Sequence, residues 1–410
     1  MEHKLIKRYL LTSLIGLSGA LLVGGVHHAQ EPSQEQRPRK VATQPSPSAS
    51  ASSPVVKPTV EPGEEIDDGD VVRVDTQLVG VPTIVTNRAG RPVPHLRADN
   101  FVVFENGTRQ EIVTFGTTDA PFEIALLLDT SGSTRADVAL IRSAANAFID
   151  ALRPGDRVAI VAFKTSRDGG TNLATVEVAS GLTSDRSALR FALENVGASN
   201  GTPYYDALSR IADDVFREPP KQDVRGRRAI VALTDGVDSA STIDYEQARD
   251  KLTKTGLATY FIQVNTEDFV EDRLMGDCRD DGSLRLSQLQ LQRYRRVFDP
   301  RGDAADYASF CRLGPFERMQ ISRNLYSLAR KEMLELSRIL GGKNFVAADL
   351  TGARSAFAQV AEEIGTQYSL GYYPTNKSRD GTVRKIKVDL RGVESGTQIR
   401  ARESYVAPAK

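Results

Sequence analysis

Short hydrophobic runs alternate with amphipathic segments over the middle of the chain. Runs of about four to eight apolar residues between turn residues are typical of buried strands, whereas apolar positions that recur about every three to four residues are typical of helices. The runs predict strands at 124–129, 158–163, 173–178, 229–234, 259–264 and 345–348, and the segments between them predict helices at about 136–152, 185–195, 204–216, 244–254, 324–340 and 352–366. This alternation predicts a doubly wound, mostly parallel α/β sheet over residues 122–367.

Two segments that flank this region alternate apolar and polar residues with a period of two, which is typical of half-buried strands. In the first segment the dipeptide Asn106-Gly107 favours a tight hairpin turn between strands at 101–105 and 108–115, and in the other segment apolar residues occupy every second position over 386–390. Because an isolated hairpin is only marginally stable, we expect residues 71–118 and 368–407 to form one small β-sandwich-like unit. The α/β domain is then inserted in this unit or flanked by it.

The first 70 residues differ in composition from the rest. Basic residues precede an apolar run at 9–26, and Ala29 follows it, as expected for a signal peptide. The alternative is an uncleaved membrane anchor, because about 17 or more apolar residues can span a bilayer. We expect residues 1–29 to be one of the two, and the protein to be exported, to the periplasm or the extracellular space. Residues 30–70 are rich in Pro and Ser, which predicts a disordered linker.

The overall composition narrows the classes of function. The chain has 53 Lys and Arg residues and 53 Asp and Glu residues, so its charge favours neither nucleic acid nor an anionic membrane as a partner. Membrane contact is expected only through the N-terminal anchor. The four histidines form no zinc motif, and no Gly-x-x-x-x-Gly-Lys phosphate loop is present, so nucleotide hydrolysis has no support.

Oxygen-bearing side chains follow two of the predicted strands. Asp129, Ser131 and Ser133 alternate after the first strand, Asp235 follows another, and Thr202 lies between Gly and Pro. Ligands of doubly wound sheets bind at the carboxyl ends of the strands, and hard divalent cations take oxygen ligands. Two carboxylates and three neutral hydroxyls leave a dication attractive to a further anion. The sequence therefore predicts a site for Mg²⁺ or Mn²⁺, in which Ca²⁺ substitutes poorly because it prefers more ligands at longer distances.

This pattern resembles the metal-ion-dependent adhesion site of von Willebrand factor A (VWFA) domains. Asp-x-Ser-x-Ser, a Thr about seventy residues later and an Asp-Gly after a hydrophobic strand fill all five positions of that site. The segments 72–79, 100–107 and 368–374 resemble bacterial exported proteins called VWFA-related. The resemblance implies a Rossmann-like fold and a non-enzymatic adhesion module, in which an exposed Asp or Glu of a protein partner completes the coordination of the metal.

Two other functions stay open at this point. One is a structural or envelope-assembly protein with a non-essential metal site, which metal-independent binding would reveal. The other is an aspartic-type hydrolase, because Leu-Leu-Asp-Thr-Ser-Gly-Ser comes close to the motif of that class. Such an enzyme needs a second Asp-Thr-Gly turn, whereas Thr234-Asp235-Gly236 has a different order, and its class is all-β.

The chain has two cysteines, Cys278 and Cys311, and both lie in a long polar insertion at 266–323. Exported proteins meet oxidising conditions, so we expect a disulfide between them, with two free thiols as the alternative. Insertions of this length in a compact domain are usually functional or poorly ordered. The sequence specifies neither the partner nor the oligomeric state.

Overall fold

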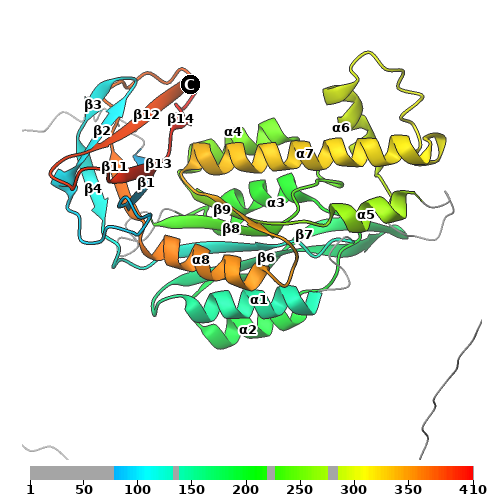
Figure 1. Ribbon diagram of the computed structural model, residues 1–410, viewed down its shortest axis with the longest axis horizontal. Helices are drawn as coiled ribbons and strands as arrows, with labels where there is room; N and C mark the ends of the chain where they lie inside the picture. The colour runs from blue at the N-terminus through cyan, green and yellow to red at the C-terminus, as the bar shows by residue number, and fades with distance from the viewer. Residues whose placement is uncertain (1–77, 133–137, 219–226, 276–284, 410) are drawn as a thin grey trace, which may run out of the picture. The chain divides into compact units, whose positions relative to one another are not determined.

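The computed structural model describes residues 78–132, 138–218, 227–275 and 285–409 (Figure 1). The predicted signal peptide or anchor at 1–29 and the predicted linker at 30–70 lie outside these ranges. Within them, every helix is too short or too polar to cross a membrane.

The central part of the chain forms a mostly parallel six-stranded sheet, as predicted. Its strands lie in the spatial order β10 (Asn344–Ala347), β9 (Ala258–Val264), β8 (Arg228–Thr234), β5 (Glu123–Leu128), β6 (Arg157–Asp168) and β7 (Thr171–Thr183) (Figure 1). All neighbours pair in parallel except β6 and β7, which are antiparallel. The strands β5, β8 and β9 are almost wholly buried, because both of their faces are covered. This explains their continuous apolar sequence.

Helices cover both faces of this sheet. One face carries α1 (Val138–Ala151), α2 (Arg186–Asn195) and α8 (Ala353–Gly365), and the other carries α3 (Tyr204–Arg210), α4 (Tyr245–Thr255) and α7 (Pro315–Leu340) (Figure 1). On the first face the rings of Phe148 and Phe357 lie 5.1 Å apart, which joins α1 to α8. On the second face Tyr204, Tyr205 and Met333 are buried against the sheet. The two layers fix the strand ends on which the predicted site depends.

Several predicted boundaries are wrong. The strands β6 and β7 extend beyond 158–163 and 173–178 into a hairpin, which turns at Gly169-Gly170 with φ of 52° and 87°. The extension is rich in polar residues, so a criterion based on apolar runs ends too early. The predicted helix 204–216 is α3 followed by a π-helical turn, Ile211–Val215. The predicted helix 324–340 begins earlier, at Pro315, which occupies the first helical turn.

The insertion at 266–323 is largely helical in its described part, which corrects the expectation of a long polar loop. It contains α5 (Glu267–Leu274), α6 (Gln288–Phe298), a 3-10 turn (Phe310–Arg312) and the start of α7. These elements enclose a small core that contains Leu274, Leu291 and Ile321. Cys278 lies outside the described residues, so its pairing with Cys311 stays a prediction.

The flanking strands form two antiparallel sheets that share one core, as predicted. The first sheet has the order β13 (Gln398–Ala401), β1 (Val79–Thr86), β11 (Tyr368–Tyr372) and β4 (Ile112–Gly116). The second has the order β14 (Ser404–Val406), β12 (Val383–Leu390), β2 (Phe101–Glu105) and β3 (Thr108–Gln110), and a 3-10 turn (Ala98–Asn100) precedes β2. Each sheet combines strands from both flanks. The domain boundaries at 118–122 and 367–368 stay predictions.

The turn between β2 and β3 is the expected hairpin, with positive φ at Asn106 (45°) and Gly107 (85°). The strand predicted at 108–115 is, however, divided. Its first part, β3, stays in the sheet of β2, and its second part, β4, pairs with β11 in the other sheet. Sequence periodicity reports the strand conformation but not the change of sheet.

A buried ion pair joins the two flanks. Glu105 of β2 and Arg384 of β12 are both 2% exposed, and their charged atoms lie 3.1 Å apart. The hydroxyls of Tyr372 and Tyr405 each donate a hydrogen bond of 2.8 Å to the other carboxylate oxygen of Glu105. One carboxylate from the first flank therefore holds three side chains from the second.

Candidate metal-binding site

Asp129 follows β5 directly and is 1% exposed. One of its carboxylate oxygens accepts a hydrogen bond from the backbone N–H of Ser131 (3.0 Å), and the other accepts one from the hydroxyl of Thr234 (2.7 Å). Because Thr234 is the last residue of β8, this second bond links the ends of two neighbouring strands. The carboxylate therefore has a fixed direction.

Asp235 follows β8 directly and is 3% exposed. One carboxylate oxygen accepts the backbone N–H of Val237 (3.0 Å), and the other accepts the hydroxyl of Thr266 (2.6 Å). The hydroxyl of Tyr326 lies 2.8 Å from that of Thr266 and 3.4 Å from the same carboxylate oxygen. Burial, and then the charge of Asp235, raise the pKa of Tyr326, so that its hydroxyl stays protonated.

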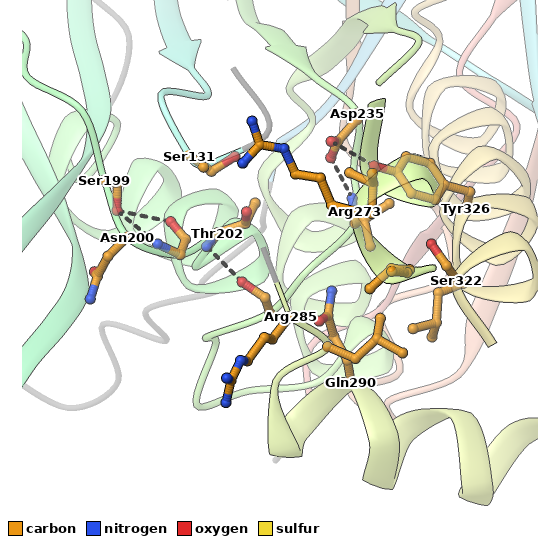
Figure 2. Close-up of a pocket in the computed structure, with 18 residues that line it drawn as sticks. Ser131, Ser199, Asn200, Thr202, Asp235, Arg273, Arg285, Gln290, Ser322 and Tyr326 are labelled. Carbon is orange, nitrogen blue, oxygen red and sulfur yellow. Dashed lines mark hydrogen bonds between the residues drawn. The ribbon is translucent and has the colours of Figure 1, made fainter. Parts of the chain in front are cut away.

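Ser131, Thr202 and Asp235 line one pocket of about 350 Å³ (Figure 2). The loop that carries Thr202 is tied to the segment after β8, because the N–H of Thr202 donates to the hydroxyl of Ser239 (2.9 Å) and the N–H of Ser239 donates to the carbonyl of Thr202 (3.0 Å). Asp129 adjoins the pocket through its bond to Ser131. Ser133 lies outside the described residues. The structure thus places four of the five predicted ligands around one region.

The charge of Asp235 acts on the neighbouring carboxylate of Asp129. Burial, and then the charge of Asp235, raise the pKa of Asp129 from its usual 3.8 to about 7, although hydrogen bonds from Ser131 and Thr234 act in the opposite direction. Within the described ranges, no group of three or more His, Cys, Asp or Glu side chains is placed to hold a metal ion. If the two carboxylates hold a metal, hydroxyls have to supply further ligands, as Ser131 and Thr202 can. Metal binding itself stays a prediction.

Sequence reasoning missed the side chains that hold the two carboxylates. Thr234 precedes Asp235, and Thr266 follows β9, so both lie at the carboxyl edge of the sheet, where ligands of such sheets bind. Their position after predicted strands could therefore have indicated that they belong to the site. Tyr326 lies in α7, and nothing in the sequence pattern relates it to Asp235.

Gly236 permits the turn after Asp235. It has φ of 76°, and a Cβ atom there would lie 2.8 Å from Cε of Met333 on α7. Gly90 has a similar φ of 73°, but among the described residues other than its chain neighbours no atom lies within 4 Å of the same position. The two glycines therefore separate the cost of the backbone conformation from the cost of crowding α7.

We expect Gly90→Ala to lower the free energy of unfolding by about 1–2 kcal/mol, which is the cost of a left-handed backbone for a residue with a Cβ atom. Gly236→Ala should lower it by a further amount of about 1–3 kcal/mol, because Met333 has to move. Urea unfolding followed by circular dichroism measures both. Equal losses in the two variants would show that Met333 yields without a cost.

A family model described as von Willebrand factor type A domain matches residues 124–237. Similar solved structures include proximal thread matrix protein 1 from the mussel byssus, at 11% identity and a TM-score of 0.34, over 59% of this chain and 48% of that chain. This chain therefore spans about half the length of that protein.

Two further structures are bacterial. A von Willebrand factor type A protein from Catenulispora acidiphila has 12% identity and a TM-score of 0.36, over 82% of this chain and 75% of that chain. The vWF domain of the type V pili tip protein Mfa5 from Porphyromonas gingivalis has 13% identity and a TM-score of 0.31, over 60% of this chain and 95% of that chain. No curated protein sequence matches the chain. The chain therefore contains a von Willebrand factor type A (VWA) domain, which the match places at residues 124–237.

Proposed function

We propose that the protein is a non-enzymatic, exported binding module, in which Asp129, Ser131, Ser133, Thr202 and Asp235 hold Mg²⁺ and an acidic residue of a protein partner completes the coordination. The observation that carries this proposal is the pair of buried carboxylates after the neighbouring strands β5 and β8, with two hydroxyls beside them. The resemblance of the motif to the adhesion site of VWA domains supports it.

The charges explain why the partner would be acidic. Two carboxylates balance the charge of a dication, whereas the Ser and Thr hydroxyls add neutral ligands. A Mg²⁺ ion in this set keeps an attraction for a further hard anion, and a carboxylate of a partner is such an anion. Because Asp235 lines the pocket, a ligand that enters the pocket can reach a metal ion held by this carboxylate.

This function requires no chemical step on the ligand. The side chains at the site hold a cation and orient it, and both carboxylates are already engaged by hydrogen bonds from Ser131, Thr234, Val237 and Thr266. We therefore expect no turnover of peptide, ester or nucleotide substrates. Metal-dependent turnover of any of these would contradict the proposal.

The test is a pull-down from envelope or secreted material with the full chain, in Mg²⁺ and in chelator. We expect one or more partners to be retained in Mg²⁺, lost in chelator and lost with Asp235→Ala. Asp272→Ala is the matched control, because Asp272 is exposed on α5 and does not line the pocket. Circular dichroism checks the fold of both variants. Partners that stay bound in chelator would instead favour a structural or envelope-assembly role.

A further inference from the structure

The pocket at the proposed metal site has two walls of different origin. One consists of residues of the VWA motif and the loop around Thr202, and the other consists of residues from the insertion and α7. The second wall contributes the basic residues Arg273 and Arg285 and the apolar residues Val270, Leu274, Leu286 and Leu325. Its chemistry therefore differs from that of the metal-binding wall.

Arg273 is the basic residue that is directed at the site. It lies in α5, it is exposed, and its side chain extends towards Ser131 across the pocket (Figure 2). Its guanidinium packs over the ring of Phe269, 4.6 Å from the centroid, which restricts its orientation. Among the described residues, none forms an ion pair with Arg273. An arginine held in this way can pair with the carboxylate of a ligand through two parallel hydrogen bonds.

The apolar part of the wall is firmly packed. Leu274 is 0%, Leu286 6% and Leu325 4% exposed, and all three belong to the small core of the insertion. Because Leu286 and Leu325 are held in this core, they and the half-buried Val270, which packs against it, present an apolar surface of fixed position to the pocket. The volume of about 350 Å³ is near the lower end of the range of about 300–1,000 Å³ for ligand pockets, which suits a pair of adjacent side chains.

We propose that the insertion makes this site selective for a peptide segment in which an Asp or Glu is adjacent to an aliphatic residue. Arg273 pairs with the carboxylate of the acidic residue, and the apolar wall of Val270, Leu286 and Leu325 receives its aliphatic neighbour. This inference rests on the proposed metal-dependent function. It assigns to the insertion the role of a specificity element, with Arg273 as a ligand-binding residue.

The test uses the full chain, Mn²⁺ and three blocked peptides: acetyl-Gly-Asp-Leu-Gly-amide and its versions with Asn for Asp or Ser for Leu. Electron paramagnetic resonance of Mn²⁺ measures the affinity for the metal, and calorimetric titration at saturating Mn²⁺ measures the affinity for the peptides. The protein variants are Arg273→Gln and, as a matched control, Arg296→Gln, because Arg296 is exposed on α6 and does not line this pocket.

We expect Arg273→Gln to bind Mn²⁺ like the wild type and to bind the Asp-Leu peptide about tenfold more weakly, which corresponds to one charge-assisted hydrogen bond. The Ser version should bind the wild type about tenfold more weakly than the Asp-Leu peptide, because a buried leucine side chain is lost. The Asn version should not bind measurably. Arg296→Gln should change neither affinity.

Two outcomes would overturn the inference while leaving the proposed function intact. One is unchanged peptide affinity in Arg273→Gln; tighter Mn²⁺ binding by the same variant would then show that the guanidinium competes with the metal. The other is a wild-type protein that binds Mn²⁺ but prefers none of the peptides. A wild-type protein that binds no Mn²⁺ would contradict the proposed function itself.

Discussion

Glu105→Ala is expected to lower the free energy of unfolding by about 3–5 kcal/mol, because it removes the nearer and buried carboxylate of the two that pair with Arg384; the other, that of Asp380, lies 3.9 Å away and is exposed. Arg384 is 2% exposed and cannot reach water without a change of structure. The hydroxyls of Tyr372 and Tyr405 lose their acceptor in the same variant. Urea unfolding followed by circular dichroism measures the loss; the chain has no Trp, so tyrosine fluorescence gives an independent signal.

An exposed ion pair on the same strand provides the control. Lys387 and Asp389 of β12 lie 3.0 Å apart, but their side chains are 72% and 44% exposed. Lys387→Ala should therefore cost about 1 kcal/mol or less. If Glu105→Ala cost no more than Lys387→Ala, the buried pair would not hold the two flanks of the VWA domain together.

A double variant separates the loss of the pair from the loss of packing. Glu105→Leu combined with Arg384→Met removes both charges and keeps much of the volume that the two side chains fill in the core. Replacing a buried ion pair by apolar residues is often neutral or stabilising, so the double variant should be more stable than Glu105→Ala. The ion pair then serves to specify which strands meet rather than to add stability.

The sequence was sufficient to predict those elements whose burial in the fold matches the pattern of their apolar residues. The strands β5, β8 and β9 are buried on both faces, and only apolar runs satisfy that environment. Asp129 and Asp235 could be found because each is the first polar residue after such a run. Their common edge then followed from the parallel order of the strands.

The features that the sequence did not predict depend on contacts between segments that are distant in the chain. Tyr326 approaches Asp235 only because α7 packs against β9, and no local pattern encodes that approach. Arg273 is likewise an ordinary exposed residue of a short helix until the fold directs it across the pocket (Figure 2). The division of 108–115 between two sheets has the same cause, since pairing with β11 is a long-range choice.

The strongest effect on the proposed function is expected from the charge of Asp129. We expect Asp129→Asn to lower the affinity for Mn²⁺ by about a hundredfold or more, because one of two charges next to a dication is lost at short range. Ser131→Ala removes only a neutral ligand, so its effect should be nearer to tenfold. Thr234→Val should also cost about tenfold, because it removes the hydrogen bond that directs Asp129. Calorimetric titration with Mn²⁺ and Mg²⁺ measures these differences.

In the metal-free protein, Asp129→Asn should increase the stability of the fold at high pH. Because the pKa of Asp129 is raised to about 7 in the folded protein, its favourable contribution to stability is present below the unfolded-state pKa near 4 and is lost as the pH rises through about 7. At pH 8, in chelator, Asp129→Asn removes the buried charge beside Asp235 and should raise the melting temperature. At pH 8 with saturating Mn²⁺ the wild type should be the more stable of the two, since only its site binds the metal. A variant that is less stable than the wild type in both conditions would show that Asp129 supports the fold and not a cation.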